Sequence, residues 1–161
     1  MQLLLNRSLM ERLHNELRGA GRREIGGLLM GEHVDGDRFR IVDFSVQRTG
    51  GTRSCFIRNP RSHDKHLEAF FERTNNDYTR FNYLGEWHSH PGFAPLPSTE
   101  DLRTMQSIVD DTSVGVNFLV LLIARLAECE DLELTATAFR PGIAHSPVNL
   151  VPVFESVDDV P

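Results

Sequence analysis

Apolar residues recur along the chain at two different spacings, which predict a mixture of helices and strands. Near the N-terminus, Leu9, Leu13 and Leu17 are four residues apart, as on one face of a helix. A capping-box pattern that starts at Ser8 precedes this face, and Gly19 follows it. We therefore expect a helix capped by Ser8 that ends near the glycine.

Two further segments have the signals of helices. The first follows Asn59 and Pro60, because asparagine is a favourable cap and proline fits the first helical position. The second follows Ser98, another favourable cap, at the end of a proline-rich loop. The apolar faces are expected from His66, Leu67, Phe70 and Phe71 in the first helix and from Leu102, Met105, Ile108 and Val109 in the second.

Other segments have the alternation or the continuous apolar character of strands. The pair Asp35-Gly36 predicts a hairpin turn between the first two of them. Residues 116–123 form a nearly continuous apolar run, which predicts a central strand buried on both faces. The expected strands span residues 25–33, 39–46, 55–58, 83–90, 116–123 and 132–139, and residues 148–154 are a candidate edge strand.

The order of these elements predicts one α/β sandwich. A chain of 161 residues can form one domain with a core of its own, and no repeat, low-complexity tract or linker divides it. Hydrophobic residues make up 40% and charged residues 25%, as in globular rather than disordered proteins. The net charge of −6 argues against a general nucleic-acid-binding protein, although Arg53, Arg58 and Arg61 form a local basic group.

The cysteines and the lack of long apolar stretches bear on the compartment. Cys55 and Cys129 do not form a CxxC pair, so we predict two reduced, buried thiols rather than a thiolate zinc site. The N-terminus lacks the basic and apolar regions of a signal peptide. The longest apolar run, residues 118–124, is far shorter than the ~20 residues of a membrane span. A cytoplasmic protein with no membrane segment is expected.

The sequence Trp87-His88-Ser89-His90-Pro91 lies at the end of one expected strand. Because side chains two positions apart on a strand point to the same face, His88 and His90 present two imidazoles side by side, as zinc ligands do. Two histidines on one strand face also occur by chance. On this pair alone, a zinc site and two unrelated histidines remain equal alternatives.

Ser98 and Asp101 follow the proline-rich loop. Asp101 is expected on the first helical turn, where its carboxylate could complete a His₂Asp set and leave the fourth tetrahedral position for water, as in catalytic zinc sites. A plain capping box explains the same two residues without a metal. Both interpretations hold together if the Ser98 backbone caps the helix while its hydroxyl faces the site.

The complete pattern resembles the JAMM motif of the MPN-domain metallopeptidases. The family pattern is H-S/T-H-P, six residues, S, two residues, D, and this chain matches every fixed position. The upstream segment that starts at Glu24 is similar to the E-x-x-G-x-L-x-G sequence of the family, so Glu24 matches its glutamate. The resemblance implies a single-domain MPN fold over residues 1–143, a cytidine-deaminase-like sandwich with a mixed sheet flanked by about three helices. Residues 144–161 would form a C-terminal tail.

The resemblance also implies zinc-dependent hydrolysis of a peptide or isopeptide bond. His88, His90 and Asp101 would hold Zn²⁺. Glu24 would take a proton from the attacking water and deliver it to the leaving amine. Ser98 would donate a hydrogen bond to the oxyanion.

The small size and the Trp-His-Ser-His context resemble the stand-alone bacterial branch of the family, which is found beside ubiquitin-activating (E1) and ubiquitin-conjugating (E2) homologues. The implied substrate is the C-terminal tail of a ubiquitin-like protein or of a conjugated cGAS-like nucleotidyltransferase, in modifier or antiphage operons. The alternatives are a peptidase that processes a modifier or sulfur-carrier precursor, and a zinc-binding MPN scaffold without activity. Neither nucleic acid nor a membrane is an expected partner.

Other residues near the motif also have expected roles. Glu86 shares a strand face with His88 and is the alternative general base, although the resemblance favours Glu24. Trp87 is expected on the opposite, packed face of the strand. Residues 92–97 and 48–54 are the expected walls of a substrate channel. The remaining histidines, which are expected at the surface, are His14, His33, His63, His66 and His145.

Overall fold

The computed structural model describes residues 1–48 and 63–153. Within these residues the chain forms eight strands and three helices. In chain order they are β1 (Gln2–Asn6), α1 (Arg7–Ala20), β2 (Gly26–Asp35), β3 (Arg38–Phe44), α2 (Asp64–Arg73), β4 (Phe81–Ser89), α3 (Thr99–Asp110), β5 (Leu119–Leu126), β6 (Leu132–Arg140), β7 (Ile143–Pro147) and β8 (Asn149–Val153).

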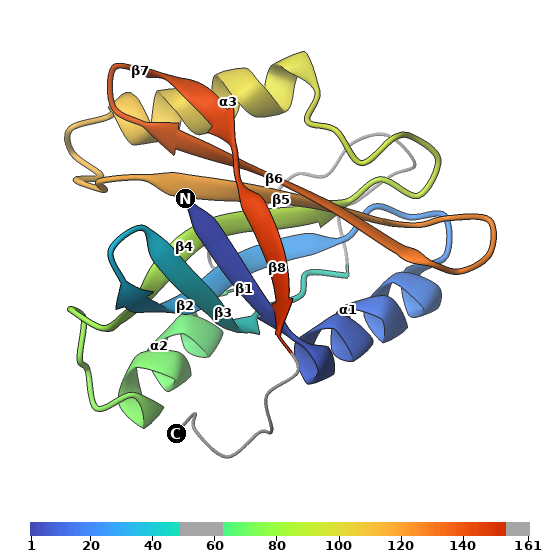
Figure 1. The fold of residues 1–161 in the computed structure, drawn as a ribbon, viewed down its shortest axis with the longest axis horizontal. Coiled ribbons are helices and arrows are strands. Elements are labelled where there is room, and N and C mark those ends of the chain that lie inside the picture. The colour runs from blue at the N-terminus through green and yellow to red at the C-terminus, as the bar shows by residue number, and fades with distance from the viewer. Residues whose placement is uncertain (49–62, 154–161) are drawn as a thin grey trace.

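All of these strands belong to one mixed sheet, in the order β7-β6-β5-β4-β2-β3-β1-β8. β4 runs parallel to β5 and antiparallel to β2, and β1 runs parallel to both β3 and β8. β7 and β8 are neighbours in the chain but stand at the two ends of the strand order, so the sheet curls (Figure 1). Val148, which joins them, is buried and donates its backbone N–H to the carbonyl of Ala136 in β6 at 2.9 Å. This bond closes the curl.

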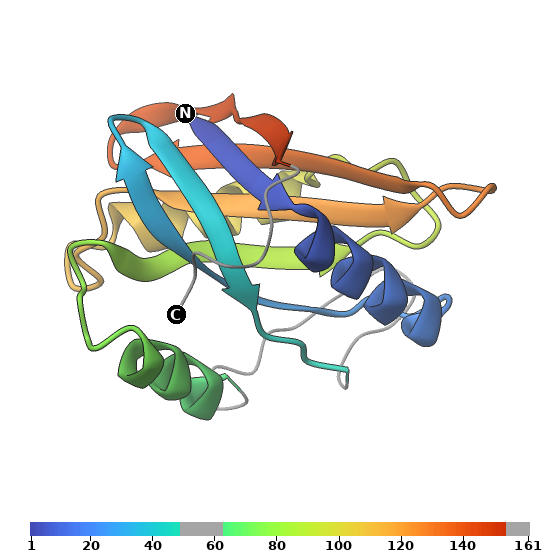
Figure 2. The ribbon, with the colours of Figure 1, turned by 60° about the horizontal axis from the view of Figure 1, so that its bottom comes forward.

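Helices cover both faces of the curled sheet. The side chains of β5 show this, because successive residues of a strand point to opposite faces. Val120 and Leu122 are buried in the cluster that contains α1, whereas Leu119 and Leu121 are buried in the cluster that contains α3. Figures 1 and 2 show α1 and α3 on opposite sides of β5. The predicted central strand buried on both faces is thus confirmed, as is the α/β sandwich with a mixed sheet and three helices.

Helix α1 begins earlier than its sequence signals indicated. The predicted cap at Ser8 is wrong, because Asn6 is the N-cap and its Oδ1 accepts the backbone N–H of Leu9 at 2.8 Å. β1 brings Asn6 to the helix in the extended conformation that an N-cap residue needs, and the Ser8 hydroxyl also donates to the Asn6 side chain. The predicted apolar face, which includes Leu13 and Leu17, is buried.

The strands differ from the prediction mainly at the ends of the chain. β1 and β7 were not predicted, and the candidate edge strand at residues 148–154 corresponds to β8. β7 pairs with β6 and β8 pairs with β1, so most of the described part of the expected tail lies in the sheet. The strand expected at residues 55–58, the residues Asn59 and Pro60, and the basic group Arg53, Arg58 and Arg61 all lie outside the described residues. The helix start expected after Asn59 is wrong, because α2 begins at Asp64 with His63 as its N-cap.

The prediction of two buried thiols is wrong for Cys129. This residue is exposed in the turn between β5 and β6, where the hairpin leaves the core. Cys55 lies outside the described residues. Across residues 1–48 and 63–153, no helix combines the length and the apolar character that a bilayer crossing requires.

Candidate metal centre

Strand β4 brings two histidines to its C-terminal end, with His88 in the strand and His90 directly after it. His88 and His90 are two positions apart, and their Nε2 atoms lie 3.0 Å from one another. The Nε2 of His88 lies 3.6 Å from Oδ1 of Asp101, at the start of α3. Of all the histidines, cysteines and acids in the described part of the chain, these three form the one group with ligand atoms close enough for a single ion, all within 4.8 Å of one another.

The loop after β4 fixes the orientation of His90. Its Nδ1 lies 3.1 Å from the carbonyl of Ala94, and because a carbonyl only accepts, Nδ1 carries the proton. In the neutral imidazole this leaves the lone pair on Nε2, the atom that lies 3.0 Å from Nε2 of His88, and a metal-binding histidine is commonly held by such a bond. The loop itself is anchored by Arg125, which donates to the carbonyl of Phe93 at 3.2 Å, and by Thr135, which donates to the carbonyl of Pro95.

The N-terminus of α3 holds Asp101. Ser98 is the N-cap, its Oγ accepts the backbone N–H of Asp101 at 3.1 Å, and its own N–H donates to Oδ2 of Asp101 at 2.7 Å. The capping box thus uses one carboxylate oxygen and leaves Oδ1 toward His88. One expected detail is wrong, because the Ser98 hydroxyl oxygen itself forms the cap. Its hydrogen remains available to donate.

Glu24 lies two residues before β2, the strand that pairs with the histidine-bearing β4. β2 and β4 are antiparallel, with Gly26 opposite His88, so Glu24 arrives at the end of β4 that carries the ligands. Its side chain is buried, at 5% exposure. Burial raises the pKa of Glu24 above its ordinary value; a protonated His90 would lower it, and the negative charge of Asp101 raises it. The carboxyl group therefore shares one electrostatic environment with the histidine and aspartate group.

The donor set fits a zinc ion. Burial lowers the pKa of His88 to about 4, against an opposing effect of Asp101 and with a smaller contribution from His90, so its imidazole is neutral near pH 7. Neutral imidazoles and a carboxylate are ligands that Zn²⁺ accepts, and three protein ligands leave one position open. Hydrogen bonds to Ala94 and Ser98 already orient two of the three.

Comparison with known proteins assigns the family. Residues 6–137, most of the chain, match the family described as prokaryotic homologs of the JAB domain. The chain belongs to this family. The solution structure of protein DSY2949 from Desulfitobacterium hafniense superposes on the JAB domain with a TM-score of 0.72 over 98% of this chain and 97% of that one, at 22% identity, which supports the fold.

Curated relatives of this JAB domain carry enzyme names. Over 109 residues, 66% of the chain, it is 31% identical to a protein named CD-NTase/cGAS isopeptidase from Enterobacter hormaechei subsp. hoffmannii, and the match covers 57% of that protein. It is 33% identical over 105 residues, 63% of the chain, to a protein of the same name from Vibrio cholerae, with 62% of that protein covered. The chain therefore spans about three fifths of the length of these two relatives.

Other residues of the JAB domain partly follow the predictions. Trp87 is on the packed side of β4 as expected, at 1% exposure, and its indole N–H donates to the Ser45 carbonyl at 2.9 Å. Glu86 is half-buried opposite Leu28 of β2, and the Tyr83 hydroxyl lies 3.5 Å from its Oε1. Its part in the site stays a prediction.

The predicted surface position of one histidine is wrong. His63 is buried at 1% exposure, not at the surface, because Ser45 provides it with a buried partner, Oγ to Nδ1, at 2.7 Å. The Ser45 Oγ also accepts the N–H of Leu28, so this hydroxyl joins His63 to β2. This pairing joins residues 18 positions apart, which no local pattern reveals.

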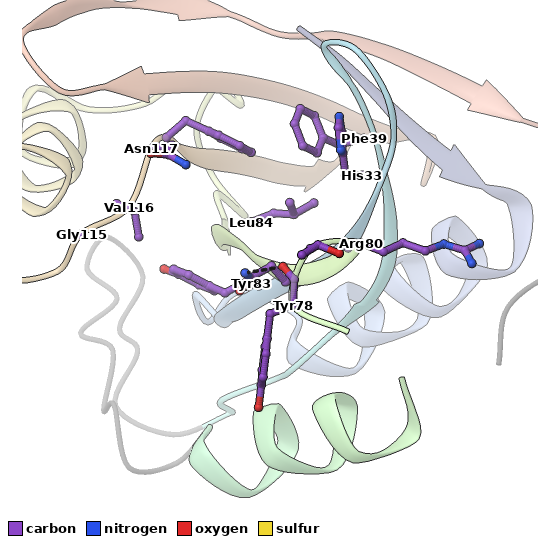
Figure 3. A pocket seen from close by; sticks show the side chains of 13 residues that line it. His33, Phe39, Tyr78, Arg80, Tyr83, Leu84, Gly115, Val116 and Asn117 are labelled. Carbon is purple, nitrogen blue, oxygen red and sulfur yellow. Dashed lines mark hydrogen bonds between the residues drawn. The ribbon is translucent and has the colours of Figure 1, made fainter. Parts of the chain in front are cut away.

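A surface cavity of about 370 Å³ lies away from the metal centre (Figure 3). It is lined by Gly31, Tyr83 and Leu84 and by the segment 115–118, at the end of β4 opposite to His88. Since β4 rises ~3.3 Å per residue, the root of Leu84 lies about 13 Å from that of His88. The cavity is therefore separate from the candidate site.

Proposed function

We propose that this JAB domain is a zinc metallo-isopeptidase. The observation that carries the proposal is the meeting of a buried carboxyl group, Glu24, with the group of His88, His90 and Asp101. A metal site with one open position beside a buried carboxyl group is the arrangement that amide hydrolysis requires. The names of the two bacterial relatives support the same chemistry.

His88, His90 and Asp101 would hold the ion. When bound, Zn²⁺ lowers the pKa of a coordinated water from about 15.7 to about 7 and polarises the scissile carbonyl. The hydrogen bonds to Ala94 and Ser98 keep the His90 and Asp101 side chains in place, so these ligands need little rearrangement to bind.

Glu24 acts as the general base and then as the general acid. Its raised pKa brings the carboxylate closer to the proton affinity that transfer near neutral pH requires. The proton that Glu24 takes from water goes to the nitrogen of the leaving lysine or α-amine, because an unprotonated amide anion does not depart. Breaking the C–N bond thus leaves a carboxylate on one product and an amine on the other.

Ser98 donates its hydroxyl hydrogen to the oxyanion. Its Oγ is already positioned as an acceptor from Asp101 N–H, so the remaining hydrogen can be directed toward the substrate carbonyl. The anchored loop 92–97 forms one wall of the substrate channel, with Phe93 (54% exposed) and Leu96 (61% exposed) as its apolar contacts. The second expected wall, residues 48–54, lies almost entirely outside the described residues.

The proposed substrate is the flexible C-terminal tail of a ubiquitin-like protein or of a conjugated cGAS-like nucleotidyltransferase. An extended tail can bind through main-chain hydrogen bonds beside the site. The enzyme would act in the cytoplasm with E1-like and E2-like proteins, in antiphage defence. Cleavage of a precursor uses the same residues, since only the leaving group differs.

The test compares wild type with Glu24→Gln and with Glu86→Gln as its matched control. The substrates are C-terminal fusions of a ubiquitin-like modifier and of a cGAS-like nucleotidyltransferase to a small reporter protein, and zinc content is measured for each variant. We expect wild type to cut at the tail, and Glu24→Gln to bind zinc while its rate falls by ~10²–10⁴. Glu86→Gln should stay within about tenfold of wild type, as for a group outside the proton transfer.

Three results would contradict parts of this proposal. A wild type that holds no zinc would show that the histidines are structural. Zinc binding without cleavage of any such fusion would favour a scaffold. A large loss in Glu86→Gln with an active Glu24→Gln would transfer the role of base to Glu86.

A further inference from the structure

Ser89 lies between the two proposed histidine ligands but points away from them. Because side chains alternate on a strand, His88 and His90 face the site and the Ser89 side chain faces the interior. It is buried at 1% exposure, so a polar atom there requires a partner.

The partner is the backbone of Ile25, the residue after Glu24. The Ser89 N–H donates to the Ile25 carbonyl at 2.8 Å, and the Ile25 N–H donates to the Ser89 Oγ at 2.9 Å. In a regular antiparallel pair, two opposite residues exchange both bonds through their backbones. Here the side-chain oxygen accepts the second bond, at the point where β4 ends and the chain turns into the loop.

This second bond acts on Glu24. The Ile25 N–H and the Glu24 carbonyl belong to one planar peptide unit, so fixing the Ile25 N–H fixes that plane and with it the ψ angle of Glu24. The Ile25 side chain is itself buried in the core, at 1% exposure. Glu24 is thus held by the strand that carries both histidines.

The ligands have supports of their own. The His90 backbone N–H donates to Ala124 of β5 at 2.9 Å, and its Nδ1 is bonded to Ala94. Asp101 is held by the capping box with Ser98. Loss of the Ser89 hydroxyl therefore removes one of the two hydrogen bonds that hold the segment carrying Glu24, and it leaves the bonds of the ligands in place.

We propose that Ser89 is a positioning residue that sets the Glu24 carboxylate against the metal ligands. This inference rests on the proposed function, in which Glu24 transfers the proton. In this role Ser89 acts through the Glu24 backbone and touches neither the metal nor the substrate.

The experiment uses Ser89→Ala, which removes the oxygen, and Ser89→Thr, which keeps it. Ser45→Ala is the matched control. Ser45 is also buried, at 3% exposure, and its Oγ accepts the backbone N–H of Leu28 in β2 at 2.9 Å. For each variant we measure zinc content, kcat and KM on the cleaved fusion, and the hydrogen-exchange rate of the Ile25 amide.

We expect Ser89→Ala to bind zinc as wild type does and to lose about 10- to 100-fold in kcat with KM unchanged, a smaller loss than removal of the base gives. Exchange at the Ile25 amide should accelerate at least tenfold. Ser89→Thr should recover most of both, and Ser45→Ala should keep kcat and the Ile25 exchange rate.

The inference is overturned if exchange at the Ile25 amide accelerates in Ser89→Ala while kcat stays at the wild-type value. In that case, cleavage of the fusion by wild type still supports the proposed function. It is equally overturned if Ser45→Ala loses as much kcat as Ser89→Ala, because the effect is then general loosening. A wild type that binds zinc without cutting overturns the proposed function and this inference together.

Discussion

Replacing Asp43 by Asn should cost stability in a way that depends on pH. Asp43 is buried in β3, and its carboxylate receives hydrogen bonds from Arg12 of α1 at 2.5 Å, from His66 of α2 at 2.9 Å, and from Arg73 of α2. The carboxylate thus joins two helices to the sheet. Its removal leaves the two guanidinium groups without their shared anion.

The magnitude follows from the pKa of Asp43. Burial alone would raise it, but the hydrogen bonds from Arg73 and Arg12 outweigh burial and lower the pKa from 3.8 to about 2. A difference of nearly two pKa units corresponds to about 2 kcal/mol of the free energy of unfolding. Because the folded-state pKa is the lower one, this contribution is complete above the unfolded value near 4. It is lost as pH falls through the folded value near 2.

The assay is urea denaturation of wild type and Asp43→Asn between pH 7 and pH 2, with a chelator present throughout so that metal release does not contribute. At pH 7 the variant should be less stable by about 2–3 kcal/mol, and this difference should fall below about 1 kcal/mol near pH 2. Glu11→Gln is the control, because Glu11 pairs with Arg7 at the exposed surface, at 2.8 Å, and should change stability by less than about 0.5 kcal/mol. A difference between wild type and Asp43→Asn that is constant over the whole pH range would refute the electrostatic reasoning.

Two further substitutions test the packing behind the site and the channel wall. Gly27→Ala should destabilise by about 3 kcal/mol in urea denaturation, because an added Cβ would lie 2.1 Å from the Ser45 carbonyl oxygen, whereas Gly19→Ala, with open space around it, should stabilise α1 by about 0.5 kcal/mol. Equal stability of the two variants would contradict the close approach of β2 to Ser45. Phe93→Ala should raise KM for a tail fusion about 5- to 10-fold with kcat retained, through the loss of about 1 kcal/mol or more of apolar contact; an unchanged KM would remove this loop from the channel.

The strands and helices around the candidate site were predictable because their signals are local. Ser98 and Asp101 predict the start of α3, and the structure confirms this capping box. The alternation at Trp87 and His88 places one side chain inside and the other toward the site. The candidate ligands were therefore found from the spacing on one strand and one helix turn.

The features that were missed depend on partners far away in the chain. β1 pairs with β3 and β8, so the short segment from Gln2 is a strand only because the sheet curls around to meet it. His63 is buried because Ser45 provides a buried hydrogen-bond partner for its side chain. Asn6 rather than Ser8 caps α1 because β1 places Asn6 at the start of the helix. The contact between Ser89 and Ile25 spans 64 positions and has no trace in local spacing.

The distance in sequence between Glu24 and the histidines has a consequence for when the proposed activity would arise during folding. The proposed base lies just before β2, and two of the proposed ligands lie at the end of β4. These strands pair only after the chain between them, including β3 and α2, has been synthesised and folded. Such long-range pairing forms late and slowly compared with a helix or a local hairpin. A complete but partly unfolded chain therefore carries all the chemical groups without the site, and the proposed hydrolysis would be restricted to molecules that have completed their tertiary structure.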